Sequence, residues 1–194
     1  MNVSPIDKVF ENHYWRKIYH LCGGMLLALG LIWLDQGWFV LLDAFYVLAF
    51  LILGRRISFA AIGVMLLLVM SGSKPITLGA TVIWVVGDGL AGLLGAAYGK
   101  KKWPWNSQKS IFGSASFFTG SYLAMLVVLG VFDVTQDCAH ELLLLVPCLV
   151  AAIVETLPVT FIRDRKPDDN LTVILATGLV LWLMIYVLGV ENSY

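Results

Sequence analysis

Residues 75–98 read PITLGATVIWVVGDGLAGLLGAAY, an apolar stretch long enough for an α-helix to cross a lipid bilayer. Its one charged residue is Asp88, and a second acid, Glu155, lies in another apolar stretch, 148–161. A carboxylate at membrane depth costs about 3 kcal/mol or more unless it is paired, bound to a metal or hydrated. The two acids therefore predict a polar reaction site inside a bundle of membrane helices.

The composition of the whole chain agrees with this interpretation. Of its 194 residues, 59% are hydrophobic and 13% are charged, whereas soluble domains average about 45–50% and about 25%. This excludes an ordinary soluble domain and predicts an all-α, polytopic membrane bundle formed by a single domain, residues 1–194. Uninterrupted apolar runs are typical of helices rather than of alternating barrel strands. We expect about seven transmembrane helices, at 18–34, 37–54, 57–72, 75–98, 110–132, 139–162 and 171–190.

Basic residues predict the orientation of these helices, because cytoplasmic loops are enriched in Lys and Arg. With a cytoplasmic N-terminus and seven crossings, 12 of the 13 basic residues lie in cytoplasmic segments, and only Lys74 lies outside. We therefore expect an integral, multi-pass membrane protein whose polar site faces the cytoplasm. The first 17 residues are polar, so no cleavable signal peptide is expected.

A cytoplasmic loop, GKKKWPWNSQKSIFGS (99–114), carries a cluster of cations suited to a polyphosphate: Lys100, Lys101, Lys102 and Lys109. Backbone amides at the start of the following helix add an anion site near Ser110, Gly113 and Ser114. The positive-inside rule alone is the alternative explanation for the lysines. No GxxxxGK[ST] motif occurs, so this is not a Walker A loop.

Small residues precede this loop on one helix face. Gly92, Gly95 and Gly99 follow Asp88 at intervals of three or four residues. Close packing against a neighbouring helix explains the glycines without any catalytic function. It does not explain Asp88, which packing would not favour.

The second long cytoplasmic loop, FIRDRKPDDNLT (161–172), ends with oxygen ligands of the type that Mg²⁺ prefers, Asp168, Asp169 and Asn170. Together with Asp88 and Glu155 they place several carboxylates around one pocket. Such charges repel each other unless a cation neutralises them. We therefore expect this set to bind Mg²⁺. Helix capping is the alternative, because the three residues directly precede a predicted helix.

The N-terminal segment YWRKIYHLCGG (14–24) brings further polar groups to the same side of the membrane. Arg16 and His20 share a helix face, and Lys17 lies near its edge. We expect Arg16 and Lys17 to bind phosphate and His20 to act in proton transfer. Interfacial anchoring of the cations and a structural histidine are the alternatives.

These blocks together resemble the CTP-dependent polyprenol kinase family, which includes phytol kinases, dolichol kinases and fungal CTP-dependent diacylglycerol kinases. The residues that carry the resemblance are RKIYH (16–20), GDGLAGLLGAAYGKKK (87–102), NSQKSIFGS (106–114), ETLPV (155–159) and DDNLT (168–172). Their order and cytoplasmic location are similar to those in the family, and the phytol kinases look most similar. The chain is much shorter than eukaryotic dolichol kinases.

The resemblance implies transfer of the γ-phosphate of CTP to the hydroxyl of a membrane lipid alcohol, with Mg²⁺ as cofactor. Asp88, Asp169 and His20 are the expected catalytic residues. The lipid tail would lie in a lateral groove lined by residues such as Trp84, Phe117 and Phe118. The expected partners are a nucleoside triphosphate, the lipid alcohol and membrane lipids, without nucleic acid; a homo-oligomer is neither required nor excluded.

Two other function classes stay open at this point. A CDP-lipid synthase would join CTP to a lipid and release pyrophosphate. An ion-coupled transporter would use the intramembrane carboxylates as ion sites, but it is expected to show inverted repeats, and none is visible in the sequence. The sequence does not distinguish among phytol, farnesol, geranylgeraniol, undecaprenol and diacylglycerol as substrates.

Overall fold

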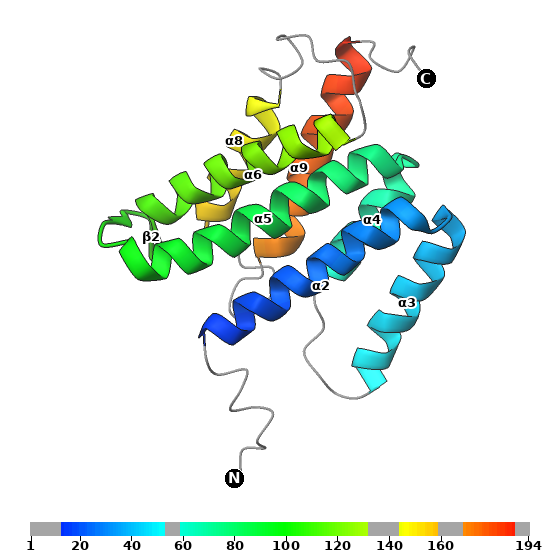
Figure 1. Ribbon diagram of the computed structural model, residues 1–194, viewed down its shortest axis with the longest axis horizontal. Coiled ribbons are helices and arrows are strands. Elements are labelled where there is room, and N and C mark those ends of the chain that lie inside the picture. Colours follow the sequence, from blue (N-terminus) through cyan, green and yellow to red (C-terminus); the bar gives the residue numbers. More distant parts are fainter. Residues whose placement is uncertain (1–12, 53–58, 132–143, 159–168, 189–194) are drawn as a thin grey trace.

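A computed structural model describes residues 13–52, 59–131, 144–158 and 169–188, shown in Figure 1. These residues form helices joined by short turns and one small β-hairpin. The helices are α2 (His13–Trp33), α3 (Gln36–Ile52), α4 (Phe59–Ser71), α5 (Lys74–Tyr98), α6 (Ile111–Val131), α8 (Leu145–Thr156) and α9 (Asp169–Leu188). The hairpin strands are β1 (Lys102–Trp103) and β2 (Asn106–Ser110).

The all-α fold class is confirmed, and each of the seven predicted apolar stretches overlaps one of these helices. Helix α5 and residues 111–128 of α6 are long and apolar enough to cross a membrane, judged by length and composition. In the other described helices the apolar stretch is shorter, between 10 and 17 residues. Helix α8 ends at Thr156, just before Pro158, because proline cannot donate the next helical hydrogen bond. The number of crossings stays a prediction.

Helix α5 is the centre of the bundle. It contacts α2, α4, α6, α8 and α9, and Figure 1 shows it running between α2 and α6. The contact with α6 is close because Gly87 has no side chain: a methyl group there would lie 2.6 Å from the ring of Phe117. Packing of this kind drives helix association where lipid surrounds the bundle. Helix α5 therefore presents its residues to several neighbouring helices at once.

The hairpin lies within residues 99–114, which were expected to form a loop. Its strands pair antiparallel, with Lys102 opposite Ser110. The rings of Trp103 and Trp105 stack with centroids 4.7 Å apart, a favourable arrangement for neighbouring aromatic side chains. Trp103 Nε1 also donates a hydrogen bond to Ser114 Oγ at 2.9 Å, so the hairpin is attached to the first turn of α6.

Large apolar side chains are exposed on the outer faces of α2 and α3. Leu26, Trp33, Trp38 and Phe45 are each more than half exposed. Asp43 differs from its neighbours on α3, since it is 4% exposed and its carboxylate accepts no hydrogen bond from the described residues. Asp43 therefore lies buried in the middle of α3 rather than at one of its ends.

Candidate active site

Asp88 is paired with two side chains from α2. Lys17 Nζ lies 2.9 Å from Asp88 Oδ1 and 2.7 Å from Oδ2, and it also approaches the Asp88 backbone oxygen at 3.3 Å. His20 Nε2 lies 3.1 Å from Asp88 Oδ2. Asp88 is 6% exposed, so these contacts replace the water that a carboxylate would otherwise bind. Lys17 and His20 reach it together because they lie three residues apart on one face of α2.

His20 also packs against the indole ring of Trp84. The two rings meet edge to face, with centroids 4.5 Å apart and an interplanar angle of 76°. Trp84 Nε1 donates a hydrogen bond to Asn170 Oδ1 at 2.9 Å. Trp84 thus connects α2, α5 and the first turn of α9 beside Asp88, from which it lies one helical turn away. Residues of two of the predicted cytoplasmic segments, His20 on α2 and Asn170 at the start of α9, therefore lie on either side of Trp84.

The predicted lipid groove is wrong for two of its three residues. Trp84 is 3% exposed and Phe117 is fully buried between α5 and α6, so neither lines an open groove. Phe118 is half-buried and packs against the core. An aromatic residue in a membrane helix is equally suited to a lipid-facing surface or to helix packing, and the sequence pattern alone did not separate these roles.

A second ion pair lies nearby. Lys109, on β2, contacts the Glu155 carboxylate near the end of α8. Glu155 is 3% exposed, and a buried carboxylate of this kind needs a close counter-charge. The positive charge of Lys109 also acts on the Asp88 carboxylate. The two ion pairs therefore form one electrostatic cluster at the hairpin end of the bundle.

Lysines, rather than a cluster of acids, surround the described carboxylates. In the described part of the chain, no three His, Cys, Asp or Glu side chains lie close enough together to hold a metal ion. Asp168 and the side chains of Arg16 and Asp169 lie outside the described residues, and Asn170 Oδ1 accepts the Trp84 hydrogen bond. Asp88 and Glu155 each contact a lysine, and binding of Mg²⁺ by the predicted set stays a prediction.

The cationic loop divides into two parts. Lys100, Lys101 and Lys102 are exposed at the base of the hairpin, whereas Lys109 points inward to Glu155. The residues predicted to form the adjoining anion site are buried. Ser110 Oγ accepts a hydrogen bond from the Gly113 amide at 3.0 Å, and Ser114 Oγ donates one to the Ser110 carbonyl at 3.3 Å. These bonds cap α6, and phosphate binding by this group stays a prediction.

The glycine face of α5 accommodates two different neighbours. A methyl group at Gly95 would lie 3.1 Å from Ser110 Oγ and 3.2 Å from Gly113 Cα, and one at Gly99 would lie 2.2 Å from Ser110 Oγ. The absence of side chains at these two glycines therefore lets the junction of β2 and α6 pack closely against α5, as expected if the glycines serve helix packing. Gly92 faces the side chain of Lys17 instead.

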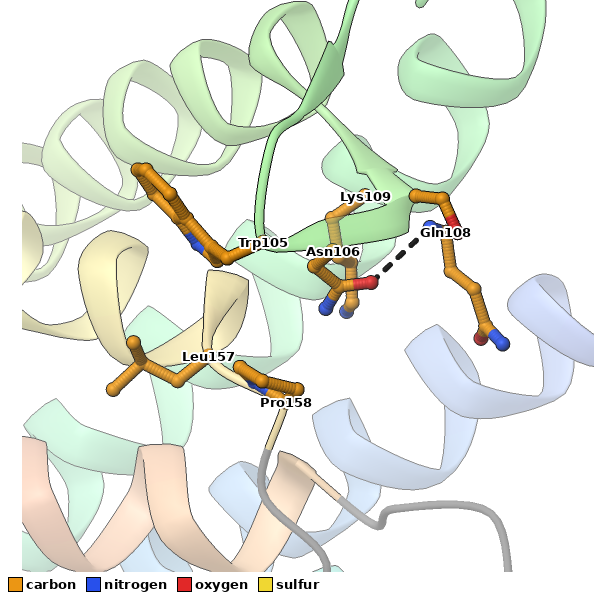
Figure 2. Close-up of a pocket in the computed structure, with 7 residues that line it drawn as sticks. Trp105, Asn106, Gln108, Lys109, Leu157 and Pro158 are labelled. Atoms are coloured by element: carbon orange, nitrogen blue, oxygen red, sulfur yellow. Dashed lines mark hydrogen bonds between the residues drawn. The ribbon is translucent and has the colours of Figure 1, made fainter.

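A pocket of about 220 Å³ adjoins the second ion pair and was not predicted. Figure 2 shows the hairpin residues on one side and Leu157 and Pro158, just after α8, on the other. Asn106 shapes the pocket by donating to the Thr156 carbonyl at 3.0 Å and accepting from the Gln108 amide at 3.1 Å. The lining residues are Trp105, Asn106, Ser107, Gln108, Lys109, Leu157 and Pro158.

Known proteins with similar sequences are lipid-alcohol kinases by name. Probable phytol kinase 2 of Glycine max is 42% identical over 104 residues, which cover 50% of this chain and 34% of the relative. The farnesol kinase of Arabidopsis thaliana is 32% identical over 116 residues, 58% of this chain and 36% of the relative. Over half of its length, the chain resembles phytol and farnesol kinases.

A third relative, phytol kinase 1 of Arabidopsis thaliana, is 33% identical over 103 residues, 50% of this chain and 32% of the relative. These matches confirm the resemblance predicted from the sequence blocks. The chain spans about a third of the length of the curated relatives that it matches. No family model and no solved structure matches it.

Proposed function

We propose that the protein is a kinase that transfers the γ-phosphate of CTP to the hydroxyl of a membrane lipid alcohol of the phytol or farnesol type. The single observation that carries this proposal is the cluster in which Lys17 and His20 contact Asp88 while Lys109 contacts Glu155. Phosphoryl transfer depends mainly on positioning and on neutralising charge, and this cluster offers cations, acids and an imidazole within one site. The named activities of the relatives support the same chemistry.

In this proposal the bundle crosses the membrane seven times, with its N-terminus and active site on the cytoplasmic side. The distribution of basic residues supports this orientation. Exposed apolar side chains on α2 and α3 support lipid contact around the bundle, since soluble monomers rarely expose large contiguous apolar patches. The nucleotide then arrives from the cytosol and the lipid hydroxyl from the membrane, and they meet at the hairpin end.

The triphosphate binds near Lys109, with the exposed lysines of the hairpin base and Arg16 adding positive charge. The nucleoside lies over the pocket between the hairpin and the end of α8, because that pocket adjoins Lys109. Lys17 binds the triphosphate only after it gives up some of its hydrogen bonds to Asp88, since its three close contacts all go to that residue. Nucleotide binding therefore requires an exchange of partners within the cluster.

The oxygen atoms of Asp88 and Glu155 are of a type that fits Mg²⁺, together with those of Asp168, Asp169 and Asn170. When bound, the ion would neutralise charge on the phosphates. Asp88 and Glu155 each contact a lysine, so occupancy by Mg²⁺ requires those two lysines to turn toward the phosphates.

The reaction forms a bond between the lipid oxygen and the γ-phosphorus and breaks the bond from that phosphorus to the β–γ bridging oxygen, so that CDP leaves. The hydroxyl proton passes to Nδ1 of His20, because Nε2 lies 3.1 Å from Asp88 Oδ2 and keeps its hydrogen beside that carboxylate, which orients the ring. Asp88 and Asp169 are the alternative acceptors. Proton loss is late in a loose transition state, so this base contributes modestly to the rate.

The test uses the purified protein in detergent with Mg²⁺ and each labelled nucleotide in turn. Phytol, farnesol, geranylgeraniol, undecaprenol and diacylglycerol are the acceptors. A phosphorylated lipid together with CDP is the expected pair of products. A CDP-lipid with pyrophosphate would instead identify a cytidylyltransferase, and the absence of any lipid product from every nucleotide would contradict both enzymes and favour a transporter.

A further inference from the structure

Gly92 stands beside the ion pair at Asp88. It follows Asp88 by one helical turn on the same face of α5, and the side chain of Lys17 crosses directly over it. A methyl group at position 92 would lie 2.2 Å from Lys17 Cε, 2.8 Å from Cδ and 2.8 Å from Nζ. Real contacts of a methyl group are never so short, so any larger residue would displace the lysine from its present path.

The other glycines in the described helices have different neighbours. Gly24 faces Val85, Gly89 faces Leu21 and Gly120 faces Leu90, all of which are apolar packing contacts. Among the described glycines, Gly92 is the one that faces the end of a charged side chain. Helix packing explains why Gly24, Gly89 and Gly120 have no side chain. At Gly92, the space that a side chain would occupy is taken by Lys17 on its way to Asp88.

The contact between the ammonium group of Lys17 and Asp88 depends on this path of the side chain past Gly92. The side chains of Lys17 and Asp88 are 14% and 9% exposed, so little water is available to replace either partner of the ion pair. Lys17 Nζ makes three close contacts with Asp88, two to its carboxylate and one to its backbone oxygen. Because the lysine is flexible, an obstacle at position 92 would move its end away from the carboxylate without forcing the helix backbones apart.

We propose that Gly92 is a positioning residue, whose missing side chain lets Lys17 reach Asp88 and hold that carboxylate in a fixed orientation before substrate binds. The importance of Gly92 for phosphoryl transfer rests on the function proposed above. Its effect on the ion pair does not rest on that function, since the pairing of Lys17 with Asp88 also contributes to the stability of the fold. The two consequences are therefore measurable separately.

The experiment is a double-mutant cycle with Gly92→Ala, Lys17→Ala and the double variant. Gly23→Ala is the matched control, because a methyl group at Gly23 would have no atom within 4 Å. It reports the general effect of replacing a glycine by alanine within a helix, which stabilises the helix. Thermal unfolding and lipid-alcohol kinase kinetics are measured on all the variants.

Gly92→Ala is expected to lower kcat about 10- to 100-fold, as a small displacement of a catalytic group does, with little change in KM for the lipid alcohol. In the Lys17→Ala background, the same substitution should have almost no further effect on kcat, and it should change Tm only as much as Gly23→Ala does in the wild-type protein. Gly23→Ala should leave kcat unchanged.

Equal effects of Gly92→Ala with and without Lys17 would overturn the proposal, because the glycine would then be needed for packing alone. A wild-type kcat and Tm in Gly92→Ala would overturn it as well. If no lipid alcohol is phosphorylated by the wild-type protein, the proposed function fails, but the coupling in Tm still decides the role of Gly92.

Discussion

Lys109 of the hairpin contacts Glu155 of α8 across 46 residues of sequence. The acid is almost fully buried, whereas a quarter of the lysine side chain stays exposed. The pair is therefore asymmetric, because loss of the lysine leaves a buried charge, while loss of the acid leaves a cation that can turn to solvent.

This asymmetry predicts the outcome of two substitutions. Lys109→Met should lower the free energy of unfolding by about 2 kcal/mol, less than for a fully buried pair because solvent screens the exposed lysine. Glu155→Gln should lower the free energy of unfolding by less than Lys109→Met does. The variant with both substitutions should regain most of the stability that Lys109→Met alone loses. Thermal or denaturant unfolding in detergent measures each value. Equal losses from the two single substitutions would contradict the asymmetry.

Asp88 is expected to be essential for turnover. Asp88→Asn removes the negative charge while keeping nearly the same volume, so we expect kcat to fall at least about 100-fold, as when a preorganised electrostatic contact is lost. The variant should stay folded, which size-exclusion chromatography in detergent and the unfolding temperature would show. Near-normal turnover would remove Asp88 from the mechanism.

Asp43 provides a matched comparison, since it is also a buried acid on an apolar helix. Its carboxylate accepts no hydrogen bond from the described residues, and burial without a partner is unfavourable. Asp43→Asn should therefore raise the free energy of unfolding by about 1 kcal/mol and leave kcat unchanged. Thermal unfolding and the kinase assay measure the two effects. A loss of activity here would show that Asp43 has a role that the described contacts do not reveal.

His20 is expected to act through its contact with Asp88. Replacing it with alanine should lower kcat about 10- to 100-fold, a modest effect because proton loss is late in the transition state. Stability should change little beyond the loss of its edge-to-face contact with Trp84, worth about 1 kcal/mol. Kinetics and unfolding of His20→Ala measure both. If the variant unfolds and the remaining folded protein turns over normally, the histidine is structural.

The proposed orientation predicts which residues react from each side of the membrane. Ser107 lies on the hairpin and Ser73 precedes Lys74 at the opposite end of α5. In a background without Cys22, Cys138 and Cys148, a cysteine replacing Ser107 should react with a membrane-impermeant maleimide only from the cytoplasmic side. A cysteine replacing Ser73 should react only from the outside. The reverse pattern, or reaction of both from one side, would contradict the topology.

The sequence predicted the features that depend on local pattern. Apolar runs of helical length predicted all of the described helices, and the basic loops predicted that Lys17, His20, Asp88, Lys109 and Glu155 would gather at one end. The hairpin was missed because residues 99–110 are polar and lack the alternation typical of a strand. The pairing of each acid with a lysine was missed for a different reason. Such contacts join residues 46 and 71 positions apart, and spacing along the chain carries no information about them.

The junction between β2 and α6 has a mechanical consequence. Ser110 is the last residue of the strand and Ile111 is the first of the helix, so no slack separates the two elements. The hairpin is therefore joined directly to α6, and this junction rests on the bare backbone of Gly95 and Gly99. A displacement of β2 would therefore act directly on the first turn of α6, because no linker residue lies between them to absorb it.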